Sequence, residues 1–226
     1  MSNIAEKLTT ITENQQKLYD KGMSDKESML WDGILWDGTR STNTEYLFAN
    51  WKDEYIRPKY KLTPTTTAHH IFFCCRNLKK IEKDYFDFSS IPNATSGVAG
   101  LVAAFNGCSN LIEIEDINLS PTTYYQAFAN CLKLEKIANI NVKIDTYLAD
   151  AFVQCKALKE VRFTGTIGTD LNFKYSPLSL DSVNNIISHL GTWTSGTHTL
   201  TFSDYTKSLI TDEMATEITN KGWGYV

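Results

Sequence analysis

Five cysteines offer the most varied chemistry in this sequence: Cys74, Cys75, Cys108, Cys131 and Cys155. Thiols can form disulfides, bind zinc or act as nucleophiles. Their odd number, and an N-terminal segment that lacks the apolar core of a signal peptide, argue against a set of disulfides. Zinc ligands usually come in close pairs such as Cys-x-x-Cys, which this sequence does not contain, so we expect no metal site.

A nucleophilic thiolate needs a base beside it, and only Cys74, close to His69 and His70, has one nearby in sequence. The sequence has no His-Glu-x-x-His, no phosphate-binding glycine-rich loop and no Gly-x-Ser-x-Gly motif. We therefore expect a protein without enzymatic activity, without catalytic residues and without a cofactor.

Four of the cysteines belong to an internal repeat. Each lies three residues after a phenylalanine, three before a leucine and six before an isoleucine or valine, and the phenylalanines are 33, 23 and 24 residues apart. Because one such unit cannot bury its own apolar side, stacked copies must share a core. We expect the cysteines to form a buried column in it. The repeat core is predicted to contain Phe72, Cys75, Leu78, Ile81, Phe105, Cys108, Leu111, Ile114, Phe128, Cys131, Leu134, Ile137, Phe152, Cys155, Leu158 and Val161.

The Leu-x-x-Ile step predicts one strand in each coil, with the strands stacked in parallel about 4.8 Å apart. In that register two rows of side chains share the outer face, one on each side of the isoleucine or valine. The first row alternates in sign, which favours charge pairing on a solvated face. The candidate interaction residues are Lys80, Glu113, Lys136 and Glu160 in the first row, and Glu82, Glu115 and Arg162 in the second, where Ala138 takes the remaining place.

An alternative for this face is acid–base chemistry by the paired carboxylates Glu113 and Glu115. That chemistry would require both to be desolvated in a cleft. Both would instead lie beside lysines on an open ribbon, so we favour the charge-paired face.

The repeat resembles the BspA-like (Treponema-type) leucine-rich repeat of bacterial proteins, over about residues 68–165. A segment from Pro92 to Gly100 lengthens the first unit. The resemblance implies a solenoid that recognises proteins or surfaces, and it carries over no catalytic residues. The predicted fold class is therefore an α/β solenoid, a leucine-rich-repeat-like stack of about four coils.

After about residue 166 the repeat is lost. Residues 178–191 predict a helix, residues 198–202 a strand, residues 211–222 a second helix and residues 223–226 a last strand. The first helix is capped by Ser179 and ended by Gly191, and its shared face comprises Leu180, Val183, Ile187 and Leu190. Because an open solenoid end exposes core and strand edge, we interpret residues 166–226 as an α/β cap.

The N-terminal residues 1–22 predict a helix with a heptad seam of Ile4, Leu8, Ile11, Gln15 and Leu18. A helix this short is marginal alone and must pack on something. Either two or three copies pair, giving an oligomer such as a homotrimer, or the helix folds against its own domain.

Residues 23–67 are rich in tryptophan and predict an N-terminal cap. The segment Phe48-Ala-Asn-Trp51 echoes Phe128-Ala-Asn-Cys131, which indicates a degenerate first coil with tryptophan in place of cysteine. The alternative is a sugar platform, since exposed tryptophan stacks on saccharide faces.

The composition and charge of the chain limit the classes of partner that it favours. The chain has 226 residues and a formal charge of −4, so neither nucleic acid nor an anionic membrane is a favoured partner. No apolar stretch approaches the roughly 18 residues of a membrane span, so we expect no membrane insertion.

The helix, the Trp-Asp-rich stretch, the repeats and the α/β end together resemble leucine-rich-repeat proteins encoded in phages and prophages of Gram-positive gut bacteria. This resemblance implies a virion component, a head or tail fibre or decoration protein. Such a protein would attach to other virion proteins through the N-terminal helix and bind a host surface protein or glycan. The alternative is a BspA-type adhesin at the bacterial cell surface.

Overall fold

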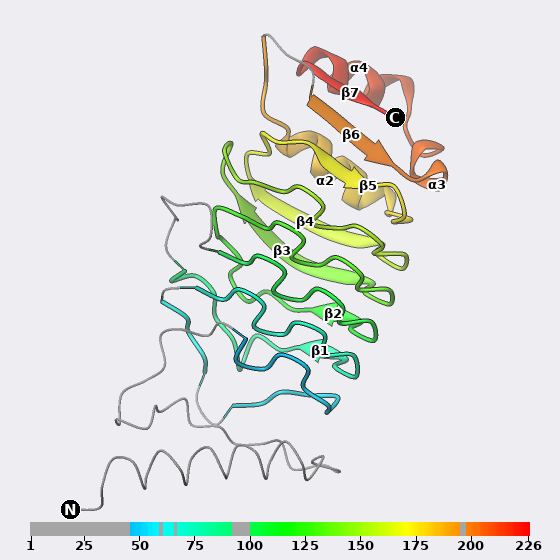
Figure 1. Cartoon of the computed structure of the whole chain (residues 1–226). Helices are drawn as coiled ribbons and strands as arrows, with labels where there is room; N and C mark the ends of the chain where they lie inside the picture. The colour runs from blue at the N-terminus through cyan, green and yellow to red at the C-terminus, as the bar shows by residue number, and fades with distance from the viewer. Residues whose placement is uncertain (1–45, 59–60, 66, 92–99, 195–197) are drawn as a thin grey trace, which may run out of the picture.

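The computed structural model describes residues 46–58, 61–65, 67–91, 100–194 and 198–226, and its coils rise one above another in a single stack (Figure 1). The predicted helix over residues 1–22, with its seam, lies outside the described residues. So do Trp31 and Trp36 of the tryptophan-rich segment, and most of the inserted segment, residues 92–99.

One sheet runs along the stack and contains β1 (Lys80–Ile81), β2 (Glu113–Ile114), β3 (Lys136–Val142) and β4 (Glu160–Gly165), in that order and all parallel. Its register is the one that the repeat predicts, because Lys80 pairs with Glu113, Glu113 with Lys136 and Lys136 with Glu160. Ile81, Ile114, Ile137 and Val161 alternate with these residues and point into the core.

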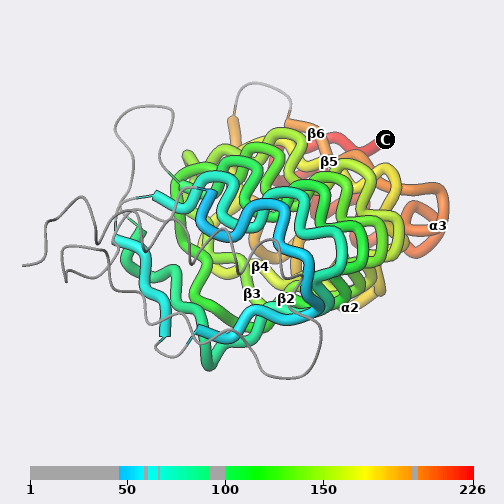
Figure 2. The backbone as a smooth tube through the Cα atoms, turned by 60° about the horizontal axis from the view of Figure 1, so that its bottom comes forward, coloured from blue at the N-terminus to red at the C-terminus, as the bar shows by residue number. Residues whose placement is uncertain are grey.

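The predicted core residues lie inside the stack. All sixteen repeated side chains are exposed by 1% or less. Their phenylalanine rings stack face to face from coil to coil. The backbone turns of successive coils lie one behind another along the stack, as Figure 2 shows. Neighbouring ring centroids are 4.5–5.7 Å apart through the series Phe48, Phe72, Phe105, Phe128, Phe152 and Phe173.

Each repeat cysteine connects its coil to the one before it. Cys108 Sγ donates a hydrogen bond to the carbonyl of Phe72 at 3.0 Å, and the other three thiols make the same bond to the phenylalanine of the preceding coil at 2.9–3.1 Å. The same carbonyls also accept a backbone N–H from within their own coil. Burial raises the pKa of all four thiols, that of Cys155 to about 12.

The turns that carry the phenylalanines contain two residues with positive φ in each coil. One stands two positions before the phenylalanine and the other two positions after it. Gly107, Asn50 and Asn130 suit such positions, since glycine and asparagine tolerate positive φ. The full set is Tyr46, Asn50, His70, Cys74, Ala103, Gly107, Gln126, Asn130, Asp150 and Gln154, with φ between 49° and 79°. Cys74, the candidate nucleophile, is therefore a turn residue. Its Sγ lies 3.0 Å from where a Cβ on Gly107 would be.

The stacking continues beyond residue 165, where the sequence pattern is lost. Phe173 stacks on Phe152, and Ser176 stands three residues later in the place of the cysteine, donating from Oγ to the carbonyl of Cys155 at 3.0 Å. Phe173 belongs to a second parallel sheet, made of β5 (Leu171–Phe173), β6 (His198–Phe202) and β7 (Trp223–Tyr225).

The helices of the C-terminal region are α2 (Leu180–His189), α3 (Asp204–Lys207) and α4 (Asp212–Asn220). Ser179 caps α2 as predicted, and β6, α4 and β7 lie where the sequence places them, whereas β5 and α3 were not predicted. Leu180 was wrongly assigned to the buried face. It is 46% exposed because it stands at the first helical position, while Ser182, Val183, Ile186 and Ile187 are the buried residues of α2.

Helix α2 covers the last edge of the first sheet. Strand β4 has no following strand, so its outward N–H and C=O groups would face solvent or a second chain. Ser182 Oγ accepts from the backbone N–H of Val161 at 3.0 Å and donates to the carbonyl of Lys159 at 3.0 Å. Asn185 accepts from the N–H of Phe163 at 2.7 Å and donates to the carbonyl of the same residue at 3.2 Å. The side chains of Ser182 and Asn185 thus make the hydrogen bonds that the backbone of a following strand would otherwise make.

Replacing Asn185 with alanine leaves both polar groups of Phe163 without their partner. We expect Asn185→Ala to lower the free energy of unfolding by about 1–3 kcal/mol, measured by urea denaturation. Asn184→Ala is the matched control, because Asn184 is exposed on the same helix. Equal losses in both variants would show that edge capping by Asn185 contributes nothing.

Candidate functional site

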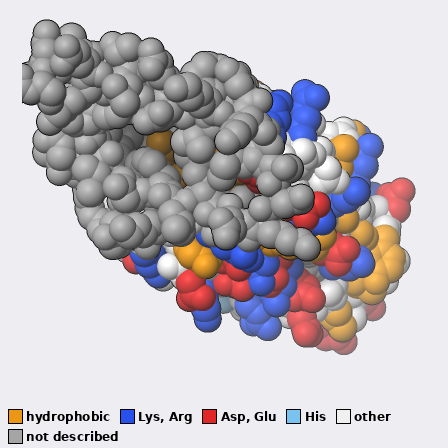
Figure 3. All heavy atoms as spheres, turned by 90° about the horizontal axis from the view of Figure 1, so that it is seen from below, with side chains coloured by type: hydrophobic (Ala, Val, Ile, Leu, Met, Phe, Trp, Pro, Cys, Tyr) orange, Lys and Arg blue, Asp and Glu red, His pale blue; other side chains and the backbone are white. Residues whose placement is uncertain are grey.

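The outer face of the first sheet carries the predicted interaction residues, which we call the charged sheet face: Lys80, Glu82, Glu113, Glu115, Lys136, Glu160 and Arg162. Glu160 and Arg162 are exposed and the other five are half-buried. Basic and acidic side chains lie next to one another on the uncovered surface in Figure 3. The sheet register aligns the four residues of the first row, and Glu82, Glu115 and Arg162 each stand two residues further along, so all seven share one side of the sheet.

Ion pairs run along the first row. Lys80 Nζ lies 3.1 Å from Glu113 and 2.6 Å from Glu115, so one ammonium is shared by two carboxylates of the next coil. Lys136 Nζ lies 3.7 Å from both Glu113 and Glu160. The alternation of sign seen in the sequence thus becomes a continuous chain of contacts, tight at the start of the sheet and looser at its end.

Sequence reasoning missed five charged residues that extend this face. Arg57 makes a two-pronged contact with Glu82, with Nε 2.8 Å and an η nitrogen 3.3 Å from the carboxylate oxygens. The others pair in a further row, Lys79 with Glu54 at 2.6 Å and Lys159 with Glu135 at 3.9 Å. The signal was present, because Lys79, Glu135 and Lys159 each stand one residue before the predicted first row.

The ion pairs of Lys80 shift its own pKa and that of Glu115. The carboxylates of Glu115 and Glu113 raise the pKa of Lys80. Lys80, together with the backbone N–H of Lys83 at 2.9 Å, holds the pKa of Glu115 below its usual 4.5. A general acid would need a raised pKa in a desolvated site. Glu115 has the opposite shift, so its environment favours the charge-paired interpretation.

The described ranges contain no group of three or more histidine, cysteine or acidic residues able to hold a metal ion. Among the same residues, no helix has both the length and the apolar character needed to cross a membrane.

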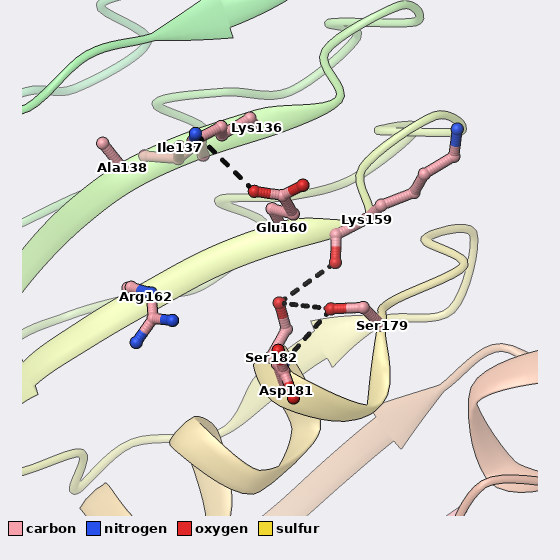
Figure 4. A pocket seen from close by; sticks show the side chains of 9 residues that line it. All are labelled: Lys136, Ile137, Ala138, Lys159, Glu160, Arg162, Ser179, Asp181 and Ser182. Carbon is pink, nitrogen blue, oxygen red and sulfur yellow. Dashed lines mark hydrogen bonds and ion pairs between the residues drawn. The ribbon is translucent and has the colours of Figure 1, made fainter.

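A hollow of about 600 Å³ lies at the C-terminal end of the charged sheet face. Its walls are β3, β4 and the start of α2, which contribute nine residues (Figure 4). Seven of them carry polar or charged side chains: Lys136, Lys159, Glu160, Arg162, Ser179, Asp181 and Ser182. The hollow thus lies where α2 takes over from the strands of the first sheet.

Comparison with protein families identifies the central part of the chain. Residues 101–194 match a model described as a BspA type Leucine rich repeat region (6 copies). The match includes the last three of the four predicted units and extends beyond them through α2 to residue 194. No curated protein and no solved structure matches the chain.

The repeat type indicates which class of function fits a face of this kind. Repeats of this family are typically binding domains rather than enzymes, and a leucine-rich repeat region suggests protein–protein interaction. The structure agrees in form, because each parallel strand adds one side chain to each row on the outer face of the sheet.

The tight pair between Lys80 and Glu115 predicts a pH-dependent contribution to stability. Because the pKa of Glu115 is lower in the folded chain, its contribution is fully present above pH 4.5 and is lost as pH falls through that lowered pKa. We expect Glu115→Gln to cost about 0.5–1 kcal/mol of unfolding free energy at pH 7.

The measurement is urea denaturation of both proteins at pH 7 and at pH 3. Glu135→Gln is the control, since its lysine partner is 3.9 Å away. A loss for Glu115→Gln that is the same at both pH values would contradict the ion-pair account.

Proposed function

We propose that this protein is a non-enzymatic interaction protein whose repeat solenoid binds a partner protein through the charged sheet face. The observation that carries the proposal is the row of paired charges on one face of a parallel sheet, within and beside a leucine-rich repeat match. Charge arranged on a rigid support gives specificity and speeds encounter with a complementary surface.

We further propose that the protein is a phage virion component, a head or tail fibre or decoration protein that contacts a host surface. The support is the resemblance of the whole sequence layout to leucine-rich-repeat proteins of phages and prophages. In this proposal residues 1–22 attach or oligomerise the chain on other virion proteins, and many copies on one particle raise avidity without strong single-site affinity.

Mass spectrometry of purified particles from the strain that carries the gene tests this proposal. We expect the protein in the particles, and we expect deletion of residues 1–22 to remove it from them. A charge reversal on the sheet face, Lys136→Glu, should leave it in the particles but reduce their adsorption to host cells.

Absence of the full-length protein from the particles would contradict the virion role. Its recovery from the surface fraction of the bacteria instead would favour the BspA-type adhesin.

A further inference from the structure

Arg162 differs from every other cation that the outer face of the first sheet presents among the described residues. Arg57, Lys79, Lys80, Lys136 and Lys159 each lie within 4.0 Å of a carboxylate. Arg162 is exposed and has no such partner in the described part of the chain. Figure 4 accordingly draws no contact from its guanidinium to any of the residues that line the hollow.

The reason lies in what flanks Arg162 in its row. In the preceding coils this row holds Glu82 and Glu115, which pair with Arg57 and Lys80. In the coil directly before Arg162 the position is Ala138. On the other side the next strand is replaced by α2, whose Ser182 and Asn185 are neutral and bond to the backbone of β4.

A bulge in β3 lies opposite Arg162. Ile137 pairs with Val161 and Ile140 with Phe163, so two residues of β3, Ala138 and Asn139, stand opposite one residue of β4. Bulges are over-represented beside functional sites, where they redirect side chains or end pairing. Here the small side chain of Ala138 occupies the position at which the two preceding coils carry Glu82 and Glu115.

The charges around the hollow set the kind of ligand. Lys136 lies within 4.0 Å of Glu113 and Glu160, and Lys159 lies within 4.0 Å of Glu135. Among the cations that line the hollow, Arg162 is therefore the one with no carboxylate at that distance in the described part of the chain. A single carboxylate matches this one cation, whereas a phosphate dianion would bring a second negative charge toward Glu160 and Asp181, which line the same hollow. Arginine is suited to this role because its planar guanidinium binds a carboxylate through two parallel hydrogen bonds.

We infer that Arg162 binds the side-chain carboxylate of an aspartate or glutamate of the partner protein, which inserts into the hollow between β3, β4 and α2. This inference rests on the proposed function, since it assigns one contact point on the proposed binding face. The partner's carboxylate completes the row that Ala138 interrupts.

The chain contains four arginines, Arg40, Arg57, Arg76 and Arg162, so their side-chain Nε–H groups give a simple NMR spectrum. The probe is the peptide acetyl-Gly-Glu-Gly-amide, titrated into the full-length protein, with acetyl-Gly-Gln-Gly-amide and inorganic phosphate as comparisons. The Arg162 signal is identified by its loss in Arg162→Gln. Arg76 is an exposed arginine on a turn and serves as the internal control.

We expect a saturable shift of the Arg162 signal with the glutamate peptide, at an apparent affinity at least about tenfold higher than at Arg76. Ala138→Glu should abolish this shift, because it supplies the missing carboxylate from the chain itself, while Arg76→Gln should leave it unchanged. Ala138→Gln controls for the added bulk and should retain a shift larger than that of Ala138→Glu.

Equal shifts at Arg162 and Arg76, or equal effects of the two peptides, would overturn the inference. A stronger response to phosphate than to the glutamate peptide would also overturn it. The titration uses purified protein alone, so its failure is separate from a failure to find the protein in particles.

Discussion

The contact between successive phenylalanine turns is the interaction on which the rest of the structure depends. At each step a ring stacks on the ring below, and a buried thiol donates to the carbonyl of the preceding phenylalanine. Stacked rings contribute about 0.5–1.5 kcal/mol each beyond burial, and a buried hydrogen bond adds about 1 kcal/mol. Because each of the four coils with a repeat cysteine makes both contacts, these coils stack in one fixed relation.

That fixed relation sets the register of the sheet on the other side of each coil. Strands as short as β1 and β2 cannot hold a register alone, yet their side chains align because the coils behind them are aligned. The charged sheet face is a consequence, since Lys80, Glu113, Lys136 and Glu160 meet only in this register. The row ends where α2 replaces the next strand, and this is also where Arg162 is left without a carboxylate.

Much of this arrangement could be predicted from the sequence, because it is periodic. The spacing of Phe72, Cys75, Leu78 and Ile81 and of their equivalents identified the core and the strand register. The cap was harder, since Ser176 in place of cysteine breaks the pattern while Phe173 still stacks. The bulge at Ala138 and the edge capping by Asn185 depend on backbone geometry that no motif records. Arg57 was missed because, counted from Phe48, it stands at the position where the other coils carry the isoleucine or valine.

Thiol reactivity in the native protein tests the central contact most directly. The account predicts that Cys75, Cys108, Cys131 and Cys155 resist labelling in the folded state, because they are buried and their raised pKa suppresses the thiolate. Only Cys74, which is partly exposed, should react quickly, and all five should react after denaturation. Mass spectrometry of labelled peptides locates each site. Rapid labelling of Cys108, Cys131 and Cys155 in the native protein would contradict the account.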